Sequence, residues 1–171
     1  MKVYRNMLPT KEFKDLTNHL INANFPWYYN KGVVYEHEDG TPEDKKNFQF
    51  THSFYMNDVI NSDHFKILIP LIKIINPLTI VRIKANLLTR TSKIIEHGYH
   101  TDYDENSHKL TTGIFYLNTN NGYTKFKNKK VVKSEANKYI EFKGEESHTG
   151  STCTDENIRV VINFNYIKKC Y

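Results

Sequence analysis

The chain has 171 residues and a formal net charge of +5, with 7 glycines against 12 tyrosines and 10 phenylalanines. This composition excludes a disordered or collagen-like chain and favours one β-rich domain over residues 1–171. The two cysteines, Cys153 and Cys170, lack C-x-x-C spacing, which excludes a cysteine-based zinc cluster, so we assign them no role.

The sequence also indicates where the protein acts. The segment Met1–Asn6 has no apolar leader pattern, and no apolar run is long enough to span a membrane. We therefore expect no membrane association and a cytoplasmic location, or the host cytoplasm if the heavy use of Asn, Lys and Ile reflects a virus. The oligomeric state stays open.

Two helices are predicted in the first half of the chain. The first spans about Thr10–Asn22, with Thr10 as its cap and apolar residues at helical spacing. The second spans about Ser62–Ile75, and Pro70 is expected to kink or split it because proline lacks the backbone N–H.

Strands are predicted around these helices. Val33–Tyr35 and Phe48–Tyr55 alternate in polarity as strands do. The aromatic cluster Phe25–Tyr29 has two interpretations: a hydrophobic plug at the edge of a sheet, which we favour, or a platform on which a substrate stacks.

From residue 79 onward the chain is predicted to be nearly all strand. From Val81 to Leu87, apolar residues alternate with Arg82, Lys84 and Asn86. The segment Ile158–Tyr166 alternates in the same way. Such strands suit a small barrel with helices on one side and a polar cavity on the other. We expect Asn86 to face this cavity and Arg82 and Lys84 to face solvent.

His100, Asp102 and His148 form the most informative pattern. His100 and Asp102 are two residues apart, so on a strand both side chains leave from one face. Two histidines and one carboxylate are the ligands of the facial triad that holds non-haem Fe(II) with open positions. Arg159, in a predicted strand, suits a bidentate pair with a carboxylate, either of a ligand or of a distant residue such as Glu141.

The segments between these residues complete the pattern. An apolar strand is predicted over Thr112–Asn118, followed by the turn signal Asn121-Gly122, which indicates a hairpin, and a strand over Tyr123–Phe126. The lysine cluster beyond it, at positions 125, 127, 129 and 130, is predicted to be the solvated tip of a hairpin rather than a nucleic-acid-binding patch.

Over about residues 80–167 the chain resembles the 2-oxoglutarate/Fe(II)-dependent dioxygenases, most closely the prolyl-hydroxylase-like branch. The matching elements, in order, are His100 with Asp102, Tyr116-Leu117-Asn118, Gly122-x-Thr124-x-Phe126, His148 and Arg159. The resemblance implies a mainly β fold, a double-stranded β-helix (jelly roll) with two or more supporting α-helices.

The same resemblance implies the activity and its cofactors. Fe(II) would be held by His100, Asp102 and His148, and the cosubstrate 2-oxoglutarate would be bound by Arg159, Tyr116 and Asn86. O2 would be consumed in hydroxylating a small molecule or a peptide, for example at a peptidyl proline. The identity of the substrate does not follow from the sequence.

Two alternatives stay open. Oxidative demethylation of nucleic acid fits the basic charge but is disfavoured, because Asn165 stands where that branch carries a second arginine. A non-catalytic, cupin-like metal-binding module would use the same triad, yet it gives no reason for Arg159.

Overall fold

The computed structural model describes residues 1–33, 47–102 and 110–169. Its helical segments are α1 (Thr10–Leu20), the 3-10 helix η1 (Asp63–Leu68) and α2 (Ile69–Ile75). Its strands are β1 (Lys2–Tyr4), β2 (Tyr28–Asn30), β3 (Gln49–Met56), β4 (Val59–Ile60), β5 (Pro77–Thr89), β6 (Leu110–Tyr116), β7 (Tyr123–Phe126), β8 (Val131–Lys133), β9 (Lys138–Lys143), β10 (His148–Gly150) and β11 (Ile158–Lys168).

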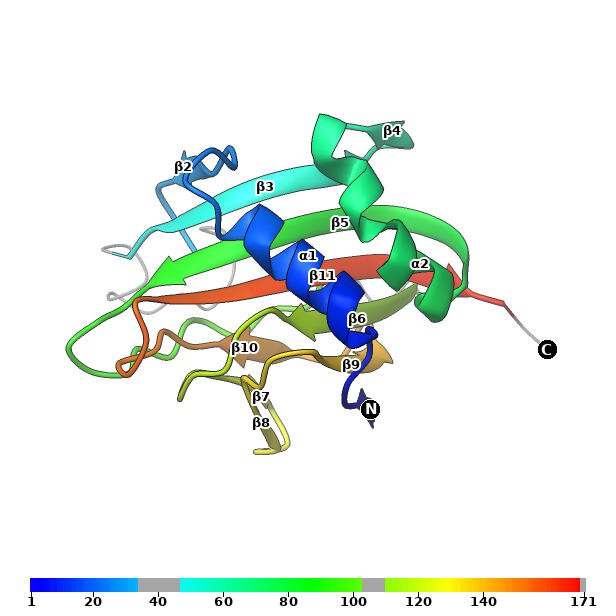
Figure 1. Cartoon of the computed structure of the whole chain (residues 1–171). Helices are drawn as coiled ribbons and strands as arrows, with labels where there is room; N and C mark the ends of the chain where they lie inside the picture. The colour runs from blue at the N-terminus through cyan, green and yellow to red at the C-terminus, as the bar shows by residue number, and fades with distance from the viewer. Residues whose placement is uncertain (34–46, 103–109, 170–171) are drawn as a thin grey trace.

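The strands form two antiparallel sheets. The larger has eight strands in the order β1-β9-β6-β11-β5-β3-β2, with β4 paired to β3, and the smaller has the order β10-β7-β8. Figure 1 shows α1 and α2 lying across one face of the larger sheet. This arrangement confirms the predicted jelly roll with two supporting helices. None of the helices described is long and apolar enough to cross a membrane.

The helices differ in detail from the prediction. Thr10 is the first residue of α1 and not its cap; Pro9 holds the cap position, and no side chain caps the helix there. The Ser62 hydroxyl does cap η1, accepting a hydrogen bond from the backbone N–H of His64 at 3.0 Å. The predicted break is also present, since α2 begins anew with Pro70 in its first turn, where a missing N–H costs nothing.

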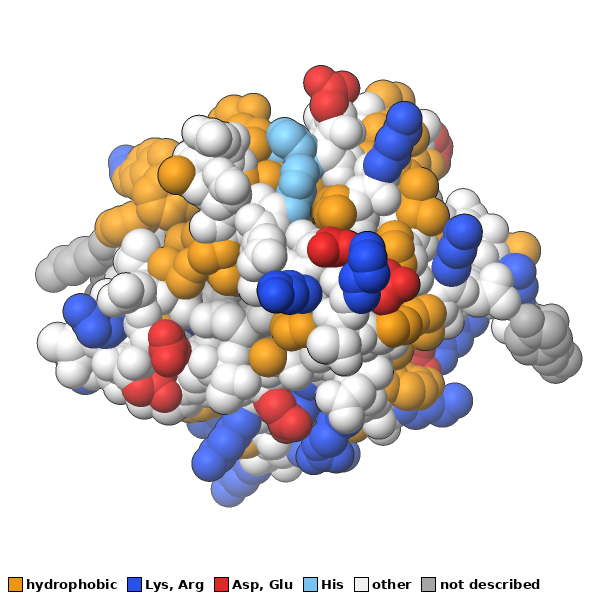
Figure 2. Space-filling model, viewed as in Figure 1, with side chains coloured by type: hydrophobic (Ala, Val, Ile, Leu, Met, Phe, Trp, Pro, Cys, Tyr) orange, Lys and Arg blue, Asp and Glu red, His pale blue; other side chains and the backbone are white. Residues whose placement is uncertain are grey.

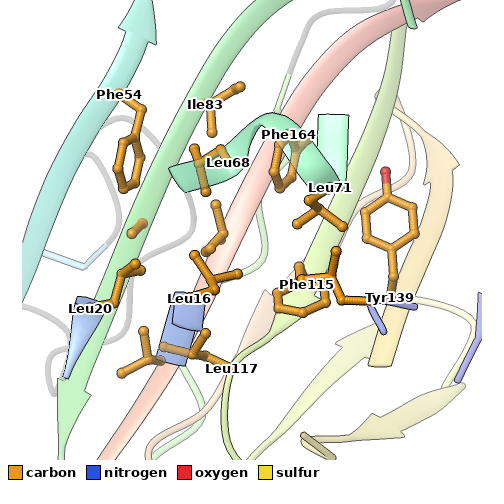
Figure 3. Packing of buried hydrophobic residues seen from close by; sticks show 14 of the residues in the cluster. Leu16, Leu20, Phe54, Leu68, Leu71, Ile83, Phe115, Leu117, Tyr139 and Phe164 are labelled. Atoms are coloured by element: carbon orange, nitrogen blue, oxygen red, sulfur yellow. The ribbon is translucent and has the colours of Figure 1, made fainter. Parts of the chain in front are cut away.

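Alternation along β5 and β11 creates the main core. One set of side chains faces the helices, where Leu16 of α1, Leu68 of η1 and Leu71 of α2 cover it (Figure 3). Each such buried aliphatic side chain contributes on the order of 1.5–3 kcal/mol. The strand residues in this cluster are Ile83, Ala85, Leu87, Val160, Ile162 and Phe164. The other set of side chains is left to face the smaller sheet.

The predicted hairpin at Asn121-Gly122 is wrong. β6 pairs with β9 and β11, whereas β7 pairs with β8 and β10, so this segment carries the chain from one sheet to the other. Gly122 is required by packing, because a Cβ there would meet Arg159 Cδ at 2.6 Å. The true hairpin is β7–β8, and its lysines gather at the lower edge in Figure 2.

The aromatic cluster is buried only in part. Phe25 is buried and Trp27 packs against the core, its indole N–H donating to the Leu20 carbonyl at 3.1 Å. Tyr28 and Tyr29, in contrast, are 62% and 64% exposed. The interpretation as a hydrophobic plug therefore holds for Phe25 and Trp27 only. The rest of the predicted strand after Val33 lies outside the described residues.

Candidate active site

The backbone brings the two histidines of the triad together. His100 and His148 form an isolated antiparallel bridge, with each backbone N–H donating to the other's carbonyl at 2.9 Å. Their ring centroids lie 4.6 Å apart. Asp102 follows two residues later, and ligand atoms of all three side chains lie within 4.8 Å of one another. Strand pairing thus assembles the set that the sequence predicted as metal ligands.

The contacts of His148 leave one ring nitrogen available. Nδ1 lies 3.0 Å from the Glu146 carbonyl oxygen, a partner that can only accept a hydrogen bond. Nδ1 therefore carries the proton in the neutral ring, and Nε2 presents a lone pair. This is the usual arrangement of a histidine ligand, in which a hydrogen bond at the other nitrogen fixes the tautomer.

Asp102 is held by three donors from the larger sheet. Its Oδ1 accepts from Arg82 Nη2 at 2.9 Å, while its Oδ2 accepts from Thr112 Oγ1 at 2.7 Å and from Asn165 Nδ2 at 3.1 Å. Each carboxylate oxygen offers two lone-pair sites. Oδ2 is thus fully used, and the remaining lone pair, on Oδ1, can bind a single metal position.

This carboxylate is kept ionised. Burial alone would raise the pKa of Asp102, but the neighbouring His148, Arg82 and His100, with the Thr112 hydrogen bond, lower that pKa to about 2. A carboxylate that stays charged at neutral pH is ready to bind a cation without first losing a proton.

A cavity of about 280 Å³ lies beside the triad. The inward faces of β5 and β11 line it, and Asn86 faces it as expected. The prediction for Arg82 and Lys84 is wrong, because both line this cavity and Arg82 pairs with Asp102. Sequence alternation alone could not separate a polar cavity from bulk solvent.

Arg159 is buried at the other end of the same wall, with 3% of its surface exposed. Its Nε donates to Ser134 Oγ at 2.9 Å, and its Nη2 donates to the Tyr123 carbonyl at 3.3 Å. Within residues 1–33, 47–102 and 110–169, no carboxylate forms an ion pair with it. Burial lowers the pKa of Arg159, yet an arginine stays charged.

The alternative partner, Glu141, is engaged elsewhere. It accepts hydrogen bonds from Lys168 Nζ at 2.6 Å, from the Tyr166 hydroxyl at 2.9 Å and from the Tyr4 hydroxyl at 2.9 Å. Arg159 is therefore a buried cation whose guanidinium has neutral partners only among the described residues. Such a group is costly unless a ligand supplies the anion.

Tyr116 lies close to this cation. Its hydroxyl donates to Thr124 Oγ1 at 2.8 Å, and the guanidinium carbon of Arg159 stands 5.9 Å from the centroid of its ring. Burial raises the pKa of Tyr116 to about 12, so the hydroxyl stays protonated. Asn86, between the two ends of the cavity, has a buried Oδ1 without a hydrogen-bond partner.

The sequence analysis missed five side chains that shape the site. Thr124 and Ser134 contact Arg159, while Arg82, Thr112 and Asn165 hold Asp102. Only Thr124 belonged to the pattern that carried the resemblance. Arg82, Thr112 and Asn165 become neighbours through strand register, since Asn165 pairs with Arg82 on one side and with Thr112 on the other.

No protein-family model and no curated protein matches the chain. Solved structures do. A 2OG-Fe(II) oxygenase from Burkholderia pseudomallei matches with a TM-score of 0.65 and 12% identity, covering 96% of this chain and 83% of its own. A prolyl-4-hydroxylase from Pseudomonas putida gives a TM-score of 0.60 and 10% identity over 98% and 92% of the two chains.

A third match is a prolyl hydroxylase from Trichoplax adhaerens, solved with a peptide fragment of the hypoxia inducible factor oxygen degradation domain. Its TM-score is 0.61 at 11% identity, over 98% of this chain and 83% of that one. Identities this low establish the architecture alone. The chain therefore shares its fold with these solved 2OG-Fe(II) oxygenases and prolyl hydroxylases.

Proposed function

We propose that the protein is an Fe(II)- and 2-oxoglutarate-dependent dioxygenase that hydroxylates a small molecule or a peptidyl residue. The observation that carries this proposal is that one cavity holds a compact His-Asp-His set and a buried Arg159 with which no described carboxylate forms an ion pair. A metal-binding module would explain the first feature but not the second.

The donor set suits iron. His100 and His148 offer imidazole nitrogens and Asp102 offers one carboxylate oxygen, while no thiolate belongs to the cluster. Two nitrogen ligands and one oxygen ligand with open positions are typical of non-haem Fe(II). Arg82, Thr112 and Asn165 would fix the orientation of the carboxylate, as neighbours of a metal ligand commonly do.

The far end of the cavity suits a dicarboxylate. Arg159 would bind the distal carboxylate of 2-oxoglutarate. Thr124, which accepts hydrogen bonds from Arg159 and from the Tyr116 hydroxyl, would keep the guanidinium in position. Asn86 would form a hydrogen bond with the cosubstrate between its two ends, as donor or as acceptor. The buried setting excludes water, which strengthens each of these interactions.

Bound iron and 2-oxoglutarate would together supply the means to activate O2 and oxidise a C–H bond, yielding succinate and CO2. The chain's own contribution is positional. His100, Asp102 and His148 line the cavity, so a metal that they hold would face it, and Arg159 would set the direction in which the cosubstrate lies. These fixed groups would hold the reactants in a reactive arrangement without reorganising.

The test has a binding step and a turnover step. Calorimetry should show Mn(II) binding, followed by 2-oxoglutarate binding that requires Mn(II). With Fe(II) and O2, slow succinate formation should appear and should be lost in His148→Ala. Lys127→Met, at the exposed β7–β8 tip, is the control and should behave like the wild type. Absence of 2-oxoglutarate binding to the Mn(II)-loaded protein would overturn the proposal.

A further inference from the structure

Lys84 is a second cation that lines the cavity, and it has no carboxylate partner in the part of the chain that the structure describes. It lies half-buried on the cavity wall, on the same strand face as Arg82. Arg82 is paired with Asp102, whereas across the described ranges no carboxylate forms an ion pair with Lys84. The wall therefore carries two cations, Arg159 and Lys84, that no carboxylate of the described residues pairs with.

Keeping Lys84 in this place is unfavourable for the protein without ligands. Burial lowers its pKa and the nearby Arg82 lowers it further, with only partial compensation from Asp102. An ammonium group withdrawn from water toward another cation costs free energy unless an anion joins it. A methionine would fill the same volume without this cost, so the charge calls for a ligand.

The position of Lys84 separates it from the pocket around Arg159. Leu88, which pairs with Arg159 across the sheet, is four residues along β5, or about 13 Å at the usual strand rise. Arg82 is only two residues away, about 7 Å by the same rise. Lys84 is thus at the metal end of the cavity, where a substrate must place the carbon that reacts.

The cosubstrate does not account for this cation. 2-Oxoglutarate has two carboxylates: the proposed function gives the distal one to Arg159, and the other would bind the metal held by the triad. Asn163, the cross-strand neighbour of Lys84, adds a buried Oδ1 that lacks a hydrogen-bond partner. A donor on a bound molecule would satisfy this oxygen, as an anion would satisfy the ammonium group.

We infer that Lys84 and Asn163 form a subsite for the primary substrate, which carries a carboxylate or similar anion next to an N–H or O–H donor. This inference rests on the proposed function. It narrows the substrate class to acidic molecules, such as N-acylated amino acids or peptides with an acidic group close to the reacting carbon, rather than neutral or cationic ones.

The experiment uses the full chain loaded with Mn(II) and saturating 2-oxoglutarate. The probes are N-acetylglycine and its uncharged amide, N-acetylglycinamide, which differ only in the carboxylate. Relaxation of their protons by Mn(II) in NMR titrations reports both affinity and closeness to the metal. The wild type should bind the acid about tenfold or more tightly than the amide, the scale of one charge-assisted hydrogen bond.

Lys84→Met should remove this preference, whereas Lys127→Met, with the same change in net charge, should keep it. A preference that survives Lys84→Met, or no preference in the wild type, overturns the inference alone, provided that Mn(II) and 2-oxoglutarate still bind. Weakening of 2-oxoglutarate binding by Lys84→Met to the extent seen with Arg159→Met also overturns it, since the lysine then serves the cosubstrate. If the wild type binds neither Mn(II) nor 2-oxoglutarate, the proposed function fails first.

Discussion

The two faces of β5 and β11 consist of alternate residues of the same strands, yet their buried groups have opposite properties. On the helix side Ile83 and Ile162 pack in a continuous apolar cluster. On the cavity side Arg82, Lys84 and Arg159 form a wall of cations. Burial of the first face stabilises the folded protein, whereas burial of the second face destabilises it.

This difference separates stability from ligand binding within single strands. Apolar side chains on the helix face need only each other and the helices. Cations on the cavity face need anions, and among the described residues the one ion pair on this face is that of Asp102 with Arg82. The face that is unfavourable without ligands is therefore the one whose residues should matter for binding, while substitutions on the other face should change stability alone. Figure 2 shows that the helix-bearing side of the molecule carries charges of both signs.

The largest effect is expected at the triad. His100→Ala, Asp102→Ala and His148→Ala should each abolish Fe(II)-dependent 2-oxoglutarate decarboxylation, because each removes one of three ligand atoms. Succinate formation and Mn(II) affinity are the measurements, with circular dichroism to verify the fold. Near-normal turnover of any variant at saturating iron would remove that residue from the ligand set.

On the opposite face, Ile162→Ala should destabilise the protein by about 2–5 kcal/mol, since a fully buried side chain would leave a cavity under the helices. Urea unfolding measures this loss. Below the unfolding transition the variant should bind Mn(II) and 2-oxoglutarate like the wild type. A matching loss of ligand affinity would show that the two faces are not separable.

Arg159→Lys should weaken 2-oxoglutarate binding by about 1–3 kcal/mol, the range of a hydrogen bond to a charged group, with Mn(II) affinity little changed. Calorimetry with Mn(II) in place of iron gives both values. Arg159→Met should also leave the ligand-free protein at least as stable as the wild type, because a buried cation without an anion is removed. Unaltered dissociation constants in both variants would refute the cosubstrate assignment.

Arg82→Met should lower metal affinity by about 10- to 100-fold, as is usual when a residue that orients a metal ligand is lost. The reason is the contact of Arg82 Nη2 with Asp102 Oδ1 at 2.9 Å. Mn(II) titration followed by electron paramagnetic resonance would measure it, with Lys127→Met as the charge control. Equal affinity in both variants would mean that Thr112 and Asn165 suffice to hold the carboxylate.

The smallest effect concerns His52, on the helix side of β3. Burial lowers its pKa below the ordinary value of 6.5, although its contact with the Pro26 carbonyl opposes this shift. The unfolded chain therefore binds the proton more readily, so stability is full above about pH 6.5 and declines as pH falls through the lower folded pKa. Urea midpoints at several pH values should show this slope, and His52→Gln should flatten it. A slope unchanged in the variant would assign the effect to other groups, such as His19, whose pKa burial also lowers.

Local patterns in the sequence predicted the elements and the type of site. The alternation of Ile83 and Ala85 with charged residues predicted a strand with two unlike faces, because the period of a strand is local. Pro70 predicted the break between η1 and α2 for the same reason. The pattern of His100, Asp102 and His148 indicated a metal site, since those residue types restrict the chemistry.

Tertiary structure decided which face of each strand meets solvent. Arg82 and Lys84 were expected outside, and they line the cavity because the smaller sheet lies over that face of β5. The donors to Asp102 come from β5, β6 and β11, far apart in sequence and adjacent only through register. The turn at Gly122 joins two sheets instead of forming a hairpin, because its local signal does not specify the partner of the next strand. Residue types and short periods thus determined the elements and the chemistry, whereas non-local strand pairing determined which charges are buried together.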